Sequence, residues 1–437
     1  MPLAQRPAAS LFAAALLLAS AALPSVTPAA DLLEVYRLAQ ANDASYQIAR
    51  YQLDAARQAA PQARSALGPQ VGLSAEVGLS ENNDDGRGSL RSDSVGISLT
   101  QPLYDRGARR DVQRADLTVS RAEADFSAAG QDLMLRVAER YFAVLHAQDS
   151  LQFARSEKEA IARQLDQAER RFEVGLIAVT DVKEAQAQYD LAVAREITAE
   201  NTLASAREVL HLTTGEPVGE LAPLREDSPL PPPVPEDIDA WVQTAQNNSL
   251  ALRAARLAAR EAAQVVEISR SGRYPNLDLV ASYAKVDSEN PFSDGEGGSL
   301  SLRLSYSLYN AGSVDSQVAR ALANARVADE QAELQRRRAV QQARDAYLSL
   351  LADISRAGAL KQALISTQVA AEATQAGFEV GTRTAVEVLA ALRNTYRAQA
   401  DYLGSRYDYL LDRLRLLQAA GTLGGGDLAK IDNWLQP

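Results

Sequence analysis

The sequence predicts a mixed α and β membrane protein in which one structural unit occurs twice. Three observations support this prediction: a self-match at a spacing of about 206 residues, four short segments of alternating polarity, and helical segments too long for a globular domain. The self-match pairs Tyr141 with Tyr347, and residues 172–175 with residues 378–381. Stacked-repeat proteins have repeats of roughly 20 to 50 residues, so this spacing indicates a duplicated domain.

Residues 1–30 have the pattern of a secretory signal peptide. Arg6 is followed by an apolar run from Leu11 to Ala19, and then by small residues up to Ala30. The run is shorter than the roughly 20 apolar residues that a membrane-anchoring helix requires. We therefore expect cleavage between Ala30 and Asp31, and export from the cytoplasm.

The composition argues against several classes of function. The chain has no cysteine, which excludes disulfides and thiolate metal sites. Its net charge of -11 argues against nucleic acid, which requires a basic surface. His146 and His211 lack neighbours at metal-binding spacing, and no nucleophile–base pair or phosphate-binding loop is recognisable. We expect no enzymatic activity, no catalytic residue, no metal site and no cofactor.

Each repeat is predicted to begin with an Ala-rich helix. This helix covers about residues 32–66 in the first copy and 238–272 in the second, and Pro69 and Pro275 follow its end. The domain boundaries follow from the duplication. The first repeat covers residues 31–215, a Pro-rich linker 216–236, the second repeat 237–421, and a short C-terminal tail 422–437.

Two strands follow in each repeat. Apolar residues alternate with small polar ones over residues 71–80, 95–100, 277–283 and 300–308, with polar loops at 81–93 and 287–298. A soluble sandwich also alternates in this way. A membrane barrel is favoured because each strand has about the 9 to 11 residues needed to cross a bilayer. The small, polar face also carries three charged residues, Glu76, Asp278 and Arg303.

Four strands cannot close a membrane barrel, since the smallest use about eight. Open strand edges are not tolerated in lipid, so several chains must share one barrel, and a trimer gives twelve strands. Tyr104, Tyr306 and Tyr309 lie at strand ends, where aromatic rings anchor barrels among lipid headgroups. Packing at the junction between strand and helix explains these residues nearly as well.

Very long helices follow the strands. They are predicted to begin at Gly107 and Gly312 and to extend to about Phe172 and Phe378, a rod on the order of 100 Å. Apolar residues three and four positions apart predict a coiled-coil seam. Tight turns then reverse the chain into a second helix and so form helical hairpins, with turns at Gly175 and Gly381 and ends at Gly215 and Gly421.

The segment from Arg171 to Asp190 and its echo from Gly381 to Leu389 resemble the TolC family of outer-membrane exit ducts. The resemblance covers essentially the whole mature chain. It implies a homotrimer with a twelve-stranded β-barrel in outer-membrane lipid, continuous with a long periplasmic α-helical coiled-coil tunnel. It also implies a passive channel for efflux or type I protein secretion. A periplasmic adaptor (membrane fusion) protein and an inner-membrane ABC or RND-type transporter would open the tunnel at its periplasmic end.

The same resemblance implies residues for the closed end of the tunnel. The matching gate positions are Arg383, Asp181, Thr180 and Phe378, and Phe378 departs from the family's tyrosine and lacks its hydroxyl. The family's two acidic rings at the entrance map to Glu387 and to Ala390, which is not acidic. The hairpin tips, where the adaptor would make contact, are Gly175, Leu176, Gly381 and Thr382.

The residues assigned to the gate also have simpler structural explanations. Asp181 and Glu387 begin equivalent helices, where an acid also offsets the helix dipole. An arginine in a turn, such as Arg383, is by default a solvated surface residue. At the level of the whole chain, the alternative is a non-conducting periplasmic coiled-coil scaffold or adaptor protein whose strands form a soluble β-domain.

Overall fold

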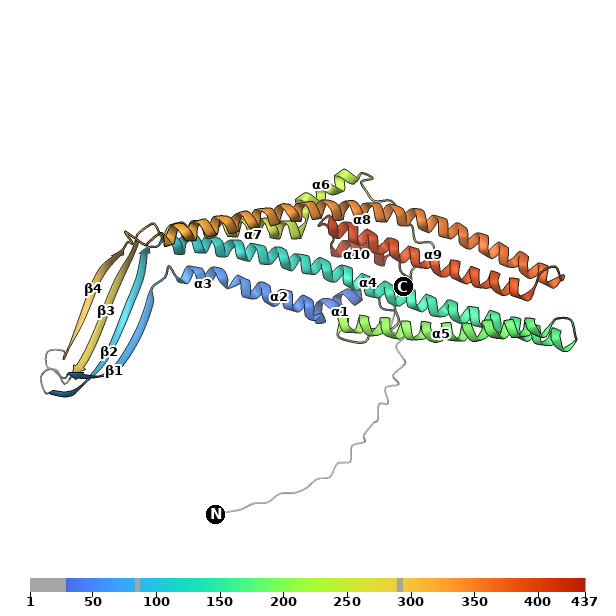
Figure 1. Cartoon of the computed structure of the whole chain (residues 1–437), viewed down its shortest axis with the longest axis horizontal. Coiled ribbons are helices and arrows are strands. Elements are labelled where there is room, and N and C mark those ends of the chain that lie inside the picture. The colour runs from blue at the N-terminus through green and yellow to red at the C-terminus, as the bar shows by residue number, and fades with distance from the viewer. Residues whose placement is uncertain (1–28, 83–86, 289–293, 437) are drawn as a thin grey trace, which may run out of the picture.

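A computed structural model describes residues 29–82, 87–288 and 294–436. The molecule is elongated, with a four-stranded sheet at one end and two helical hairpins at the other (Figure 1). The predicted leader lies outside the described residues except for Ala29 and Ala30. Ala30 is buried, and its N–H donates to the Glu220 carbonyl at 2.8 Å. Ala30 is therefore part of the fold, one residue earlier than the predicted start at Asp31.

The prediction of one continuous helix at the start of each repeat is wrong. The first copy forms α1 (Leu32–Asn42), α2 (Ala44–Arg57) and α3 (Ala59–Ser65), and the second forms α6 (Ile238–Asn248) and α7 (Leu250–Ser271). Asp43 and Ser249, which occupy equivalent positions, adopt non-helical ψ angles of 115° and 119°. Their side chains accept hydrogen bonds from backbone N–H groups of the helix that follows. Each residue is an N-cap that starts a new helix.

The sheet has the strand order β1-β2-β3-β4, and every neighbouring pair is antiparallel. The strands are β1 (Gln70–Asn82), β2 (Arg87–Tyr104), β3 (Asn276–Ser288) and β4 (Gly295–Ser305). Three of them are longer than the predicted 9 to 11 residues, because much of each predicted polar loop is strand. Residues 83–86 and 289–293 of those loops lie outside the described residues.

Four long helices form the two hairpins. They are α4 (Arg106–Glu173) with α5 (Val179–Thr214), and α8 (Ser313–Glu379) with α9 (Ala385–Ala419). At 68 residues, α4 is about 100 Å long. It begins one residue before the predicted Gly107, because the Asp105 side chain accepts the Ala108 N–H at 2.8 Å. The predicted rods and hairpins are therefore present.

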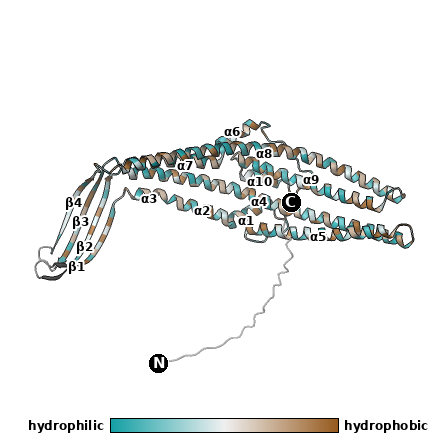
Figure 2. Cartoon of the chain, viewed as in Figure 1, coloured by the Kyte–Doolittle hydropathy of each residue, from teal (hydrophilic) through white to brown (hydrophobic). Residues whose placement is uncertain are grey.

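Hydrophobic and hydrophilic residues are mixed along every long helix (Figure 2). Within the described ranges, no helix combines the length and the apolar character needed to span a membrane. The helices instead pack lengthwise through small residues, with Ala168, Ala185, Ala192 and Ala343 all buried. Small residues let helices approach closely, as the predicted seam requires.

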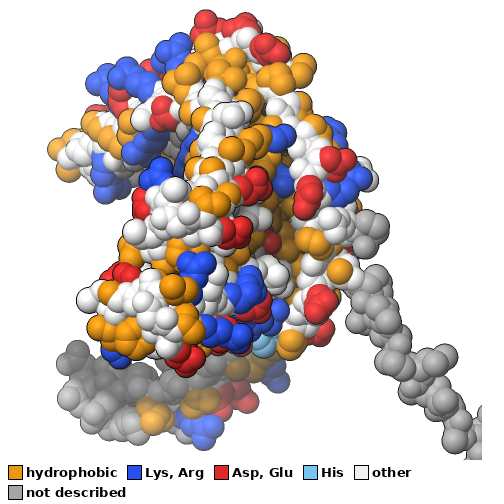
Figure 3. Space-filling model, turned by 90° about the vertical axis from the view of Figure 1, so that its right-hand side faces the viewer, with side chains coloured by type: hydrophobic (Ala, Val, Ile, Leu, Met, Phe, Trp, Pro, Cys, Tyr) orange, Lys and Arg blue, Asp and Glu red, His pale blue; other side chains and the backbone are white. Residues whose placement is uncertain are grey.

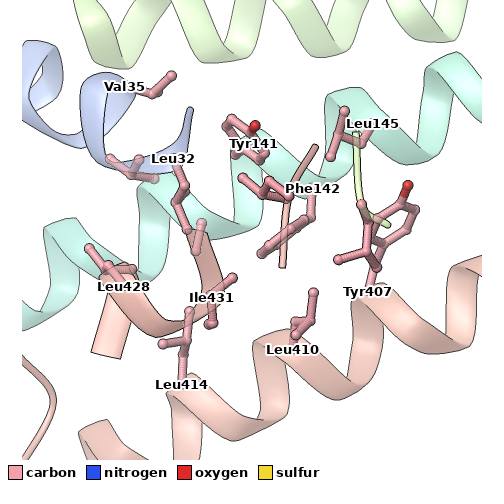
Figure 4. Packing of buried hydrophobic residues seen from close by; sticks show 14 of the residues in the cluster. Leu32, Val35, Tyr141, Phe142, Leu145, Tyr407, Leu410, Leu414, Leu428 and Ile431 are labelled. Carbon is pink, nitrogen blue, oxygen red and sulfur yellow. The ribbon is translucent and has the colours of Figure 1, made fainter. Parts of the chain in front are cut away.

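The main hydrophobic core lies midway along the helices and is called here the waist core. It combines α1, the middle of α4, α9 and a further helix, α10 (Gly425–Asp432), within the predicted tail. Leu428 and Ile431 of α10 lie beside Leu32 and Leu414 (Figure 4). The fully buried Tyr141 directs its hydroxyl to the Ala222 carbonyl at 2.8 Å, which fixes the linker against α4.

Candidate functional site

The two hairpins reverse direction by the same backbone device. Gly175 and Gly381 have φ angles of +76° and +80°, which residues with a side chain rarely adopt. The N–H after each glycine returns to a carbonyl five residues back: Leu176 to Arg171, and Thr382 to Gly377, both at 2.8 Å. These are Schellman-type helix ends, and they produce two short, parallel tips.

The tips expose apolar side chains. Leu176 is 72% exposed, Val174 69% and Val380 76%. Viewed onto this end of the molecule, hydrophobic side chains appear among charged ones on the protruding hairpins (Figure 3). Gly175, Leu176, Gly381 and Thr382 are all exposed at the ends of the hairpins, as an adaptor contact would require.

Arg383 forms an ion pair within its own hairpin. Its Nη1 lies 2.7 Å from Oε1 of Glu387, one helical turn away. Glu387 also closes a capping box, since its carboxylate accepts the Thr384 N–H at 2.7 Å and its own N–H donates to the Thr384 hydroxyl. The Thr384 N–H, and then Arg383, hold the pKa of Glu387 below its usual value. Glu387 is therefore ionised at neutral pH.

Asp181 occupies the equivalent position in the first hairpin but lacks these partners. The N-cap of α5 is Ala178, which has no side-chain acceptor. Among the described residues, the Asp181 carboxylate has no hydrogen-bond or ion-pair partner, and it is half-buried at the start of α5 beside the exposed Thr180. Arg383 and Asp181 are not paired within the single chain. A link between hairpins of neighbouring chains stays a prediction.

Phe378 joins the two hairpins of one chain. It is only 6% exposed and packs with Ala385 and Val388 of α9. The guanidinium of Arg171, at the end of α4, lies 4.3 Å from the centre of the Phe378 ring. A phenylalanine supports this cation–π contact without a hydroxyl. Phe378 is therefore already engaged by a residue of its own chain.

Arg171 was not predicted as a site residue, although the repeat contains a signal for it. Its counterpart in the second copy is Gly377. An added Cβ at Gly377 would lie 2.7 Å from Cγ of Arg383 and 3.2 Å from the Thr382 hydroxyl. The second hairpin thus needs a glycine where the first has an arginine, because Arg383 folds back across that position.

The polar contacts at this end of the molecule are ion pairs and helix caps. Over the part of the chain that the structure describes, no group of three or more histidine or acidic residues could hold a metal ion. At the second tip the polar groups bind the helix end and one another, so what they can do is fix or release the position of that hairpin.

Comparisons with known proteins agree with this architecture. The profile of the family described as outer membrane efflux protein matches residues 35–216 and 241–422, once for each repeat. The chain is 37% identical to the outer membrane protein TolC of Vibrio cholerae, over 95% of this chain and 96% of that protein. It is 31% identical to the alkaline protease secretion protein AprF of Pseudomonas aeruginosa, over 92% and 86%.

Among solved structures, the outer-membrane channel protein CusC superposes with a TM-score of 0.79 at 17% identity, covering 90% of this chain and 92% of that one. At this identity the likeness concerns the fold. The double match of the family profile and the identity to TolC over nearly the whole chain decide the family. The chain belongs to the TolC family of outer membrane efflux proteins, and is an outer-membrane protein with a large periplasmic portion.

Proposed function

We propose that this chain forms a homotrimeric, non-enzymatic exit duct, with twelve strands closing one barrel and the helical hairpins forming a tunnel that is shut at their tips. The observation that carries the proposal is the sheet. It has two open edges, β1 and β4, and an exposed apolar face, and it stands at the end of long coiled-coil helices. Open edges are not tolerated in lipid, and joining β4 of one chain to β1 of the next removes them.

The two faces of the sheet fit lipid on one side and a water-filled lumen on the other. One face carries large exposed apolar side chains, including Leu73 at 78%, Val77 at 69% and Leu302 at 66%. The opposite face carries Gly72, Ser74, Ser98 and other small or polar residues. Small lumen residues leave room for a wide passage.

The exposed surface also supports an assembly. Large apolar side chains also lie exposed on the long helices, among them Leu191 and Leu212 of α5 and Leu348 of α8. Contiguous exposed apolar surface is typical of an interface. In this proposal, packing against the helices of neighbouring chains buries these side chains.

The duct serves efflux and type I secretion, as do its relatives. AprF is a protein for secretion of alkaline protease, and TolC is an outer membrane protein. In this proposal, a periplasmic adaptor contacts the exposed tips at Gly175, Leu176, Gly381 and Thr382, and an inner-membrane ABC or RND-type transporter supplies the cargo. Arg383, Asp181, Thr180 and Phe378 hold the tips closed, and Glu387 lines the entrance.

The test combines native mass measurement with conductance. The protein purified in detergent should have the mass of three chains, and in planar bilayers it should give channels of low resting conductance. A folded chain that remains monomeric would reject the trimer. A trimer that never conducts, even when its tips are removed by deletion of residues 170–182 and 376–388, would reject the duct and favour a scaffold.

A further inference from the structure

The junction between β2 and α4 places an aromatic ring at the end of the apolar sheet face. A bulge between Pro102 and Tyr104 shifts the register, so that Tyr104 pairs with Leu277. Leu277 lies on the apolar face, opposite Leu304 of β4. The helices begin directly after this ring, with Asp105 as the N-cap of α4. Tyr104 therefore marks the periplasmic border of the apolar face.

Arg109 lies beside this ring, and Arg110 follows it in the first turns of α4. The exposed Arg109 holds its guanidinium 5.5 Å from the centre of the Tyr104 ring and donates to the Leu103 carbonyl at 3.3 Å. Arg110 donates to Gln113 at 2.8 Å, and its charge helps Arg270 to lower the pKa of Glu267 on α7. Within the described residues, neither arginine has a carboxylate within ion-pair distance. Five neighbouring arginines do have one: Arg64, Arg106, Arg114, Arg270 and Arg273.

The second repeat lacks this arrangement at the equivalent junction. Tyr309 corresponds to Tyr104, while Val314 and Asp315 stand in the places of Arg109 and Arg110. Tyr309 is 87% exposed, and Asp315 is paired with Arg273 at 2.6 Å. Among the described residues, the border of the apolar face thus carries an aromatic ring in both repeats, but arginines without a carboxylate at ion-pair distance only in the first.

We propose that Tyr104, Arg109 and Arg110 form a binding site for an anionic phospholipid of the periplasmic leaflet. Guanidinium groups bind phosphate oxygens in a bidentate manner, and the cation–π contact with the Tyr104 ring positions Arg109. The apolar face beside Tyr104 receives the acyl chains, which a soluble phosphate does not have. The inference rests on the proposed barrel, since that function puts this face in lipid.

The experiment measures lipid retention by the purified trimer in native mass spectrometry. The probes are phosphatidylglycerol, phosphatidylethanolamine and inorganic phosphate. Wild type should retain phosphatidylglycerol in preference to phosphatidylethanolamine, and inorganic phosphate should not displace it. The double variant Arg109→Gln, Arg110→Gln should bind phosphatidylglycerol roughly 25-fold more weakly, about fivefold for each arginine. The matched control Arg64→Gln, Arg273→Gln removes the same charge from paired arginines and should retain the lipid as wild type does.

Each outcome is informative. Equal retention by wild type and the double variant, or equal loss in the control, overturns the site. Displacement by inorganic phosphate overturns the lipid as its ligand. If the double variant forms no trimers, Arg109→Gln alone is measured, and a loss of about fivefold is expected. A wild-type protein without trimer or conductance contradicts the proposed function instead, so the two failures are distinguishable.

Discussion

The two hairpin tips share one backbone path but differ in their polar groups. In the second tip, Thr384, Glu387 and Arg383 bind one another and complete the helix end. In the first tip, the N-cap residue Ala178 has no side chain that could accept a hydrogen bond. The Asp181 carboxylate there has no partner among the described residues. Duplication thus preserved the turn glycines, whose φ angles permit little else, while the side chains around them diverged.

This difference bears on how a gate at this end would work. An arginine that reaches a neighbouring chain's Asp181 must leave Glu387, so one carboxylate replaces another. An exchange between two solvated ion pairs would change the free energy little, and the Arg383–Glu387 pair is largely exposed. A closed state with such a small advantage can be opened by the binding of an adaptor at the tips.

The largest effect is expected when the inter-hairpin link is removed. Arg383→Ser combined with Asp181→Ala should raise single-channel conductance events in planar bilayers roughly tenfold, because the proposed trimer would lose three weak links at once. Glu387→Gln should act in the opposite direction, since it removes the local competitor for Arg383 and keeps the capping box. Unchanged conductance in both would assign closure to hairpin packing, including the contact of Arg171 with Phe378.

The next effect compares two glycines of α8. Gly377→Ala should destabilise the second tip by about 1 to 3 kcal/mol through overpacking against Arg383. Gly358→Ala meets no atom within 4 Å and should stabilise its helix by about 0.5 to 1 kcal/mol. Hydrogen exchange of the amides around each position measures both changes. Equal protection in the two variants would show that the conformation of the Arg383 side chain does not require a glycine at position 377.

Exchanging the helix caps should give a smaller effect of opposite sign in the two tips. Thr384→Ala should cost about 1 kcal/mol at the start of α9, whereas Ala178→Thr should stabilise the start of α5 by a similar amount. Amide exchange over the first turns of α5 and α9 is the measurement. If Ala178→Thr gives no added protection, another constraint, rather than the missing cap, limits the first tip.

The smallest effect concerns the pH dependence of folding stability and a cluster of three aspartates found only in the second repeat. Asp353, Asp408 and Asp412 stand where the first repeat has Ala147, Thr202 and Ala206. Burial, and then the neighbouring Asp412, raise the pKa of Asp353 from 3.8 to about 6, while Arg356 lowers it. The raised pKa stabilises the folded protein below about pH 4, and this contribution is lost as the pH rises through about 6.

Replacing Asp353 by Asn should remove that pH dependence. The thermal unfolding midpoint of wild type, followed by circular dichroism, should fall relative to Asp353→Asn between about pH 4 and pH 6. The change should be modest, because the carboxyl group is only partly buried and solvent screens its interactions. Parallel curves for the two proteins would contradict the shift.

The fold could be predicted largely from the sequence, because its signals are local and repeated. Turn glycines, alternating strands and long Ala-rich helices each follow from short-range rules, and every one occurs twice. The helix breaks at Asp43 and Ser249 were missed because helical periodicity continues across them, although both residues are preferred N-caps. The outer part of β2 was mistaken for loop, since Arg91 and Asp93 are polar yet pair in register with Leu79 and Val77.

The candidate site was less accessible to such reasoning. The pairing of Arg383 with Glu387 is local and could have been derived from their spacing of four residues. The contact of Arg171 with Phe378 joins positions more than two hundred residues apart, and no periodicity within one helix indicates it. Residues that act between chains leave no trace in the periodicity of a single chain.

The closure of the waist core by α10 has a consequence for the order of folding. The carboxylate of Asp432 accepts the Leu32 N–H at 2.9 Å across a separation of 400 residues, and Leu435 forms a bridge with Leu224. Contacts this distant along the chain form slowly. The first helix to emerge during export can pack against α4 and α5, but its Leu32 end stays open until the last residues arrive. Throughout that interval the apolar side chains at this end of the core are prone to aggregation.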